Sequence, residues 1–506
     1  MASPTSDVHC YLGTFIHCTK KQTEVEILED TVVGVQNGKI IFVKEIKQLP
    51  HVRKEFSIPS CNVHAMHFGQ FMIPGFVDCH VHASQYVFCG SNLGLVLLDW
   101  LEKHTFPTEA KFDDLDFAAV AYTKAVERLL RNGTTTSCYF ATIHTDSTLA
   151  LCDIIEACGQ RALVGKVNMD RNSPDEYTEL SAKDSLLETE RFIDEIRRRN
   201  YRLVEPVITP RFVPNCTEEL QNGLGELAKR YDLYIQSHLS ETEAECRWVS
   251  ELHPNSRDYV SVYDKAGLLT NKTVMAHGIH LSDEELDLMK MRGVAIAHCP
   301  NSNISLRSGM LDARKILDRG MKIGLGTDLA GGYHPSILDA MRNAIAVSNI
   351  LSVQKGDDYR PLVYQDVFRL ATLGGAEALC MDERLGSFEV GKEFDALLID
   401  PHTNYSGIDA FDGDFHQEMF QKFLFLGDDR NIIEVYVQGR KIWPQPGRMT
   451  ADSRLTSCSL TDGTEFSAPV CSCGDVDPEN KTKGRFSSIR RDSDFNLAPK
   501  TSVNGE

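Results

Sequence analysis

Short apolar runs recur through the middle of the chain, and stretches long enough for amphipathic helices separate them. Eight such runs lie at residues 76–82, 134–140, 162–167, 203–209, 233–238, 273–277, 294–298 and 322–328. Alternation of buried strands with helices is typical of a parallel sheet. Eight strand–helix units favour an α/β protein whose sheet closes into a (β/α)8 TIM-type barrel, with its functional residues at the carboxyl ends of the strands.

Further β-type runs occur near both ends of the chain. They lie at residues 11–17, 29–35 and 39–43 before the barrel, and at residues 396–399 and 433–441 after it. Turn residues such as Asn37-Gly38 separate the first runs, as in hairpins. We expect the two sets to pair as one small β-sandwich domain built from both chain ends.

The pattern therefore predicts four consecutive parts. Residues 1–72 form the N-terminal part of the small β domain, residues 73–384 the barrel, and residues 385–449 the C-terminal part of the small domain. From about residue 450 the composition shifts to Ser, Thr, Asp, Lys and Gly with few apolar residues. Such a segment cannot bury a core, so residues 450–506 are expected to be a disordered tail.

Charge and cysteine content narrow the classes of partner. The formal net charge is −19, which disfavours binding to a nucleic-acid polymer or to an anionic membrane surface. The start of the chain lacks the basic and apolar pattern of a secretory signal, and no apolar run is long enough to cross a membrane. The 15 cysteines are scattered, which favours reduced thiols and a cytoplasmic location.

Histidines and a carboxylate stand at the ends of several predicted strands. His80 and His82 end the first run, and their spacing of two directs both side chains to the same face of a strand. His238, His277 and Asp328 end the fifth, sixth and eighth runs. Each alone could be a satisfied polar group at a strand end. Together, at one rim, they favour a site for a divalent metal such as zinc.

This arrangement resembles the amidohydrolase superfamily. The resemblance rests on Pro-Gly-x-x-Asp-x-His-x-His at residues 74–82, on the single histidines ending strands five and six, and on Gly-Thr-Asp ending strand eight. Members with two metals carry a bridging lysine at the end of strand four, and no lysine stands there in this chain. The resemblance thus implies one zinc ion per subunit, held by His80, His82, His238 and Asp328. It leaves His277 to orient a water molecule or to stabilise developing charge.

Glu241 lies three residues after His238, where a strand is expected to turn into a helix. It could be a first-turn acid or a capping-box partner. Alternatively it is a proton shuttle beside the metal. His-x-x-Glu at this point resembles the purine and pyrimidine deaminases of the superfamily. That resemblance implies that Glu241, Asp328 and His277 form the catalytic set.

Five local strings narrow the resemblance to the guanine deaminase family. They span residues 82–86, 139–144, 209–212, 298–303 and 326–328. The family implies conversion of guanine to xanthine and ammonia, a purine base as the small-molecule partner, and a homodimer. It implies substrate contacts from His82, Ala83, Ser84, Gln85, Arg211, Phe212, His238, Glu241 and Asp328. His298 is expected in the pocket wall and not as a metal ligand.

Two other functions remain open at this point. One is a deaminase of another aminated heterocycle, such as an oxidised purine or a triazine. The other is a barrel that has lost catalysis and serves as a binding scaffold. The second zinc deaminase pattern, His-x-Glu followed by Pro-Cys-x-x-Cys, is absent from the sequence.

Overall fold

The structure, a computed structural model, describes residues 7–20, 24–404 and 406–444. The predicted tail at residues 450–506 lies outside these residues. The domain boundaries proposed from the sequence stay predictions. No helix in the described part of the chain has both the length and the apolar character needed to span a bilayer.

The eight apolar runs form the strands of one parallel sheet, whose neighbours follow chain order. These strands are β6 (Phe76–His82), β7 (Thr134–Phe140), β8 (Arg161–Gly165), β10 (Val204–Pro210), β11 (Tyr234–Leu239), β12 (Thr273–His277), β13 (Ala295–His298) and β14 (Ile323–Leu325). A short strand, β9 (Val167–Asn168), pairs with β10. The segment after β14 meets β6, because Asp328 N donates to His80 O at 2.9 Å and His82 N donates to Leu329 O at 3.2 Å. The sheet therefore closes, and the predicted barrel is confirmed.

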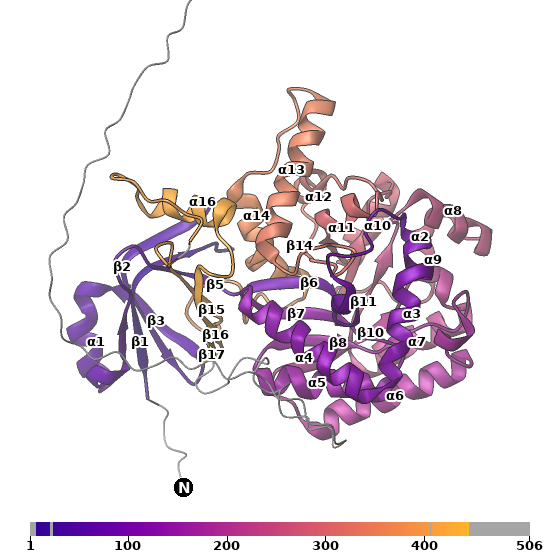
Figure 1. Ribbon diagram of the computed structural model, residues 1–506, viewed down its shortest axis with the longest axis horizontal. Helices are drawn as coiled ribbons and strands as arrows, with labels where there is room; N and C mark the ends of the chain where they lie inside the picture. The colour runs from indigo at the N-terminus through magenta and orange to yellow at the C-terminus, as the bar shows by residue number, and fades with distance from the viewer. Residues whose placement is uncertain (1–6, 21–23, 405, 445–506) are drawn as a thin grey trace, which may run out of the picture. The chain divides into compact units, whose positions relative to one another are not determined.

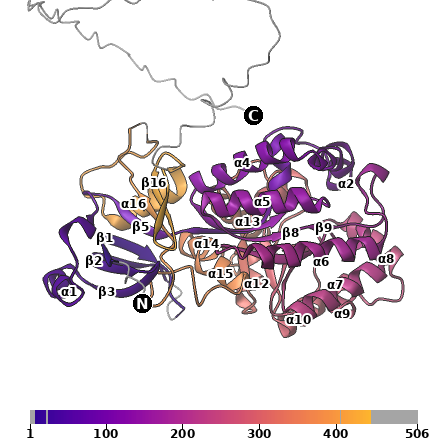
Figure 2. The same cartoon turned by 90° about the horizontal axis from the view of Figure 1, so that it is seen from below.

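Helices follow the barrel strands, and most of them cover the outer face of the barrel. They are α4 (Leu115–Arg131), α5 (Thr145–Cys158), α6 (Ala182–Arg199), α7 (Glu218–Tyr231), α8 (Glu243–Leu252), α9 (Tyr259–Lys265), α10 (Asp283–Arg292), α11 (Pro300–Ser305), α12 (Ala313–Asp318), α13 (Ile337–Lys355), α14 (Tyr364–Ala371) and α15 (Leu373–Ala378). Two short helices, α2 (Leu97–Trp100) and α3 (Phe106–Glu109), lie in the connection between β6 and α4. Figure 2 shows α4, α5, α6 and α7 running along the outside of the barrel strands.

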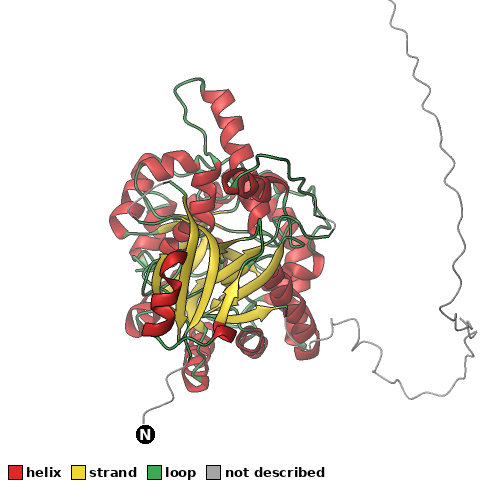
Figure 3. Cartoon of the chain, turned by 90° about the vertical axis from the view of Figure 1, so that its left-hand side faces the viewer, coloured by secondary structure: helices red, strands yellow, loops and turns green. Residues whose placement is uncertain are grey.

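Strands from both chain ends form a second, mixed sheet, in which β17-β16-β15-β5-β1-β2-β3 are neighbours and β4 pairs with β1. The strands are β1 (His9–His17), β2 (Glu26–Gln36), β3 (Lys39–Glu45), β4 (Val63–Ala65), β5 (Phe71–Pro74), β15 (Ala396–Ile399), β16 (Ile432–Val437) and β17 (Arg440–Trp443). Helices α1 (Leu49–Glu55) and α16 (His416–Leu426) accompany them. Figure 1 shows the early and late strands side by side, and Figure 3 views them from their own side of the molecule. The expected small β domain from both ends is confirmed.

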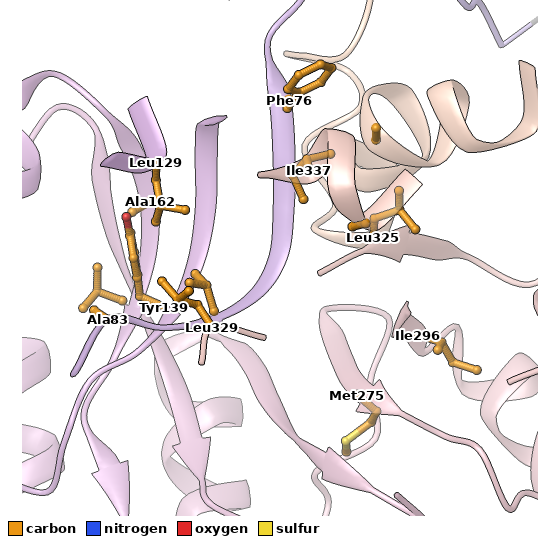
Figure 4. Packing of buried hydrophobic residues seen from close by; sticks show 14 of the residues in the cluster. Phe76, Ala83, Leu129, Tyr139, Ala162, Met275, Ile296, Leu325, Leu329 and Ile337 are labelled. Carbon is orange, nitrogen blue, oxygen red and sulfur yellow. The ribbon is translucent and has the colours of Figure 1, made fainter. Parts of the chain in front are cut away.

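A bulge in β6 decides which way its histidines point. Val77 and Cys79 belong to an apolar cluster that they share with residues of the other barrel strands and of α15. Phe76 and Val81 belong instead to the larger cluster between the strands and the helices, part of which is drawn in Figure 4. The register with β7 shifts between Asp78 and Val81. Side chains alternate along a regular strand, so this shift explains why His82, and not Val81, faces inward.

Candidate active site

The five predicted metal-site residues come together at the carboxyl ends of the strands. His80 and His82 lie on β6, His238 on β11 and His277 at the end of β12, whereas Asp328 follows β14 by three residues. Strand β14 ends at Leu325, earlier than the sequence predicted. The exposed fraction is 9% for His238 and lower for the other four. Distant parts of the chain therefore meet in one buried cluster.

The predicted ligand set fits one small cation. His80 Nε2 lies 3.1 Å from Asp328 Oδ1, and His82 Nε2 lies 3.5 Å from the same oxygen. His82 Nε2 lies 3.1 Å from His238 Nε2. Atoms bound tetrahedrally to one zinc ion at 2.0–2.1 Å are about 3.3 Å apart. The spacing of these donor atoms thus suits a single ion.

His277 forms an overlapping group with the predicted ligands. The donor atoms of His80, His238, His277 and Asp328 all lie within 4.8 Å of one another. His277 Nε2 lies 3.8 Å from Asp328 Oδ2 and 3.4 Å from Glu241 Oε2. Within the described residues, the buried Nε2 atoms of His80 and His277 lie near carboxylate oxygens but make no well-aligned hydrogen bond. Buried nitrogens that converge on one point without well-aligned hydrogen bonds are suited to bind a cation.

Neighbouring acceptors fix two of the imidazole rings. His238 Nδ1 lies 2.6 Å from the carbonyl oxygen of Arg211, and His277 Nδ1 lies 2.9 Å from Asn303 Oδ1. A carbonyl oxygen can only accept, so each Nδ1 carries the hydrogen. In the neutral form of each ring Nε2 is then unprotonated, and it can bind a cation or accept a proton.

The electrostatics also favour a bound cation. Burial lowers the pKa of His80, and lowers those of His82 and His238 further still, so these three imidazoles are neutral. Burial acts to raise the pKa of the Asp328 carboxyl, but the facing histidines, His80 first, hold it well below its usual value. Neutral imidazoles and an ionised carboxylate are the forms that bind divalent metals.

Asp78, which sequence reasoning did not single out, supports this cluster from behind. Its Oδ1 accepts from Thr327 N at 3.0 Å and from His80 N at 3.2 Å, and its Oδ2 accepts from Thr327 Oγ1 at 2.5 Å. It therefore ties β6 to the residue before Asp328. Its place in the Asp-x-His-x-His pattern was the available signal.

Glu241 faces the same cluster and is not a helix-capping residue. The N-cap of α8 is Thr242, and Glu245 is its capping-box partner. Glu241 Oε1 accepts from Ser308 Oγ at 2.8 Å. Burial raises the pKa of Glu241 to about 7, although the adjacent His277 opposes the shift. A carboxyl group with a pKa near neutrality can both give and take a proton at physiological pH.

A pocket opens onto these groups. Its lining consists of His82, Gln85, Leu97, Trp100, Leu101, Arg211, Phe212, His238, Glu241, Glu245, His277, Leu306 and Asp328. The predicted base-binding residues Gln85, Arg211 and Phe212 are all among them. Aromatic and aliphatic walls with a few polar groups are typical of sites for small molecules.

Three predicted residues do not line this pocket. Ala83 is packed in the apolar cluster between strands and helices. Ser84 is buried, with its hydroxyl 3.4 Å from Glu109 Oε1. His298 is completely buried, which lowers its pKa to about 3, and so it lies behind the wall that it was expected to form. The sequence shows that these residues are near the site but not which way they point.

Glu109 is the second residue that the sequence did not reveal. It is completely buried and contacts Gln85 and Arg211. It is the last residue of the short helix α3, in the connection between β6 and α4, so no strand periodicity marked it.

Comparisons with known proteins agree with the geometry. The model of the amidohydrolase family matches residues 71–442. Guanine deaminases of Homo sapiens and Rattus norvegicus are both 52% identical to this chain, and each match covers 86% of it, with 97% of the human and 96% of the rat protein. A crystal structure of guanine deaminase from C. acetobutylicum, with guanine bound in its active site, superposes with a TM-score of 0.80 at 39% identity. That match covers 86% of this chain and all of the other.

The metal-site cluster, the adjacent pocket and the closed barrel thus occur in a chain of which 86% matches nearly the whole length of these relatives. The chain belongs to the amidohydrolase family, and the relatives described above are guanine deaminases.

Proposed function

We propose that this protein is a zinc-dependent aminohydrolase that converts guanine to xanthine and ammonia in purine catabolism. One observation carries the proposal. One pocket brings Glu241 and the metal-site cluster together with Gln85, Arg211 and Phe212. The first group suits proton transfer and water activation, and the second suits a planar base.

The base-binding side chains match the chemistry of guanine. The guanidinium of Arg211 can donate to the carbonyl oxygen of the base, and the amide of Gln85 can bind a purine edge. Phe212 supplies an aromatic face on which a ring can pack. Arg211 and Phe212 directly follow β10, which places both side chains at the carboxyl rim of the barrel.

One zinc ion would be held by His80, His82, His238 and Asp328, and when bound it would make a water molecule nucleophilic at neutral pH. Asp328 is ionised and can take the proton that this water loses. His277 stands beside Glu241 and Asp328, and although burial opposes it, these two carboxylates raise the pKa of His277. A protonated His277 can stabilise negative charge that develops during attack.

Glu241 moves the second proton. As water oxygen bonds to the amine-bearing ring carbon, Glu241 donates a proton to the adjacent ring nitrogen, which prevents negative charge from accumulating on the ring. The amine then takes the proton held by Asp328, the carbon–nitrogen bond breaks, and ammonia leaves. Glu241 recovers its proton as the ring carbonyl of xanthine forms. Guanine and water are consumed, and xanthine and ammonia are produced, in equal amounts.

A substrate panel tests the proposal. The purified protein is given guanine, 8-oxoguanine and an aminotriazine, and ammonia is measured together with the identity of the ring product. We expect xanthine and ammonia from guanine in a 1:1 ratio, with the highest kcat/KM of the three. Turnover of another ring with none of guanine would identify the alternative deaminase, and a purified protein with no bound metal would favour the scaffold.

We further propose a homodimer. Helix α13 and the region around α16 expose the large apolar side chains Ile350, Val353, Phe411, Phe415, Phe425 and Leu426. The two elements are joined, because Arg342 on α13 donates to the carbonyl oxygens of Leu424 and Gly427. Exposed apolar surface of this kind is typical of an interface. Light scattering at micromolar concentration should give twice the mass of one chain, and a monomer would contradict the proposal.

We also propose that the protein acts in the cytoplasm on free purine base, without a nucleic-acid polymer or a membrane as partner. The net charge of −19 supports this. None of the cysteines in the described ranges forms a disulfide bond, as expected for a reducing compartment. Fractionation of cells that express the protein tests the location.

A further inference from the structure

Glu109 connects the two polar base-binding side chains without lining the pocket itself. Its Oε2 accepts from Arg211 Nη1 at 2.6 Å and from the Tyr177 hydroxyl at 2.8 Å. Its Oε1 accepts from Gln85 Nε2 at 3.0 Å and from the Ser84 hydroxyl at 3.4 Å. The side chain of Glu109 is fully buried. A carboxylate has room for four donors, and here four surrounding groups supply them.

These contacts fix the amide of Gln85 in one orientation. A carboxylate can only accept, so the Gln85 nitrogen must face Glu109. A backbone N–H can only donate, and Ala330 N lies 3.2 Å from Gln85 Oε1. Two partners of opposite character therefore hold the two ends of the amide, and a flip would break both hydrogen bonds. One N–H of Gln85 is used by Glu109, so its second N–H is left to offer to the pocket, while its oxygen is held by Ala330 N–H.

The same carboxylate fixes Arg211. The short ion pair with Glu109 holds one end of the guanidinium, and its carbon lies 5.0 Å above the centre of the Phe106 ring. An arginine side chain has five N–H donors and no acceptor. Arg211 and Gln85 together therefore form a wall of the pocket that presents donors.

We propose that Glu109 is a positioning residue that determines base specificity by fixing N–H donors of Gln85 and Arg211 in this wall. Such a wall selects a base with a carbonyl oxygen beside it and rejects a base with an amine there, because two donors would then face each other. This inference rests on the proposed function. It assigns to Glu109 the discrimination between guanine and bases that carry an amine in place of the ring carbonyl. Sites built to hydrogen-bond a substrate discriminate strongly, because a mismatch leaves buried groups unpaired.

A purely structural role predicts a different result. If Glu109 only neutralises the charge of Arg211, its loss should weaken the binding of all bases equally. If it sets the donor pattern, Glu109→Gln should allow Gln85 to flip and present its oxygen, since the new amide can donate as well as accept. The preference among bases should then change, and not only the overall rate.

The test compares two pairs of bases with the metal-loaded, full-length protein. Guanine and 2,6-diaminopurine carry the same reactive amine, but 2,6-diaminopurine has a second amine where guanine has its carbonyl oxygen. We measure kcat and KM for both. Hypoxanthine and adenine differ at the same position and lack that reactive amine, so their dissociation constants are measured by calorimetry. The variants are Glu109→Gln and Tyr177→Phe. Tyr177→Phe removes one donor to Glu109 and leaves the ion pair intact, so it decides the question if Glu109→Gln does not fold.

The matched control is Glu393→Gln, which makes the same change in a buried ion pair with Arg161 at the amino end of β8, away from the pocket. We expect the wild-type protein to prefer guanine and hypoxanthine. Glu109→Gln should reduce both preferences by about tenfold or more, Tyr177→Phe by less, and Glu393→Gln should leave both ratios unchanged.

Unchanged ratios in folded, metal-loaded Glu109→Gln and Tyr177→Phe would overturn the inference, as would a wild-type protein that binds adenine as well as hypoxanthine. A wild-type protein that prefers hypoxanthine but fails to deaminate guanine would contradict the proposed function alone. The hypoxanthine-to-adenine ratio in the variants would still decide the role of Glu109.

Discussion

At the scale of single residues, two carboxylates a few ångströms from the same histidine have opposite properties. Asp328 faces His80, His82 and His277, which hold its pKa well below the usual value despite burial. Burial raises the pKa of Glu241 to about 7. When the surroundings lower the pKa of one acid and raise that of another, the first acid is suited to bind a cation and the second to transfer protons.

Replacement of Glu241 by Gln tests that division. Glutamine keeps the shape and can still accept from Ser308, but it cannot transfer a proton. We expect kcat for guanine to fall by about 10²–10⁴-fold, while the metal content of the purified protein stays as in the wild type. His238→Ala is the contrasting variant, because it should lose the metal itself. Near wild-type turnover by Glu241→Gln would remove Glu241 from the mechanism.

At the scale of elements, the strand period predicts much of the site, because residues that end parallel strands meet at one rim. It does not predict the β6 bulge between Asp78 and Val81, which depends on pairing with β7. Nor does it predict where β14 ends, since Asp328 adopts a left-handed φ of 46° beyond the strand. Glu109 was missed because it ends a helix of four residues, which is too short to show a periodic pattern. What the sequence left open therefore depends on tertiary contacts.

Asp78 gives a prediction at this scale, because it joins β6 to the segment that carries Asp328. Asp78→Ala removes three hydrogen bonds that set the spacing between His80 and Asp328. Loss of such supporting contacts typically weakens metal binding by about 10–100-fold, which competition with a chelator would measure.

Ser282→Ala is the control for Asp78→Ala, because it removes the N-cap hydrogen bond of α10. It should cost about 1 kcal/mol of stability and leave metal affinity unchanged. If Asp78→Ala binds metal as tightly as the wild-type protein, Asp78 has no role in positioning the ligands.

At the scale of the whole described molecule, the barrel and the small sheet are joined by a buried ionic contact. Arg161 on β8 lies 2.6 Å from Glu393 Oε2 and 3.1 Å from Asp395 Oδ2, both of which precede β15. The Arg161 side chain is only 2% exposed. Glu393 and Asp395, which lie late in the sequence, thus contact the barrel at the amino end of β8, the end opposite the active site.

Arg161→Ala should therefore destabilise the fold and leave the chemistry intact. Removal of one partner from a buried ion pair typically costs about 3–5 kcal/mol, because the remaining charges are buried without compensation. Urea unfolding at fixed metal concentration measures the change, and kcat for guanine should be retained below the transition.

Arg191→Ala is the comparison, because Arg191 pairs with Asp146 and Glu188 at the surface. Exposed pairs contribute about 0–1 kcal/mol. Equal losses of stability in the two variants would show that the Arg161 contact contributes no more than a surface pair.

The central claim is that the rim histidines and Asp328 hold a metal ion that is required to deaminate guanine. The direct measurement is ammonia release from guanine by the purified protein, before and after treatment with a chelator, and after one equivalent of zinc is returned. We predict release in the untreated protein, loss of at least 90% of the rate after chelation, as expected for metal-assisted hydrolysis, and recovery with zinc. An undiminished rate in protein shown to be free of metal would contradict the account.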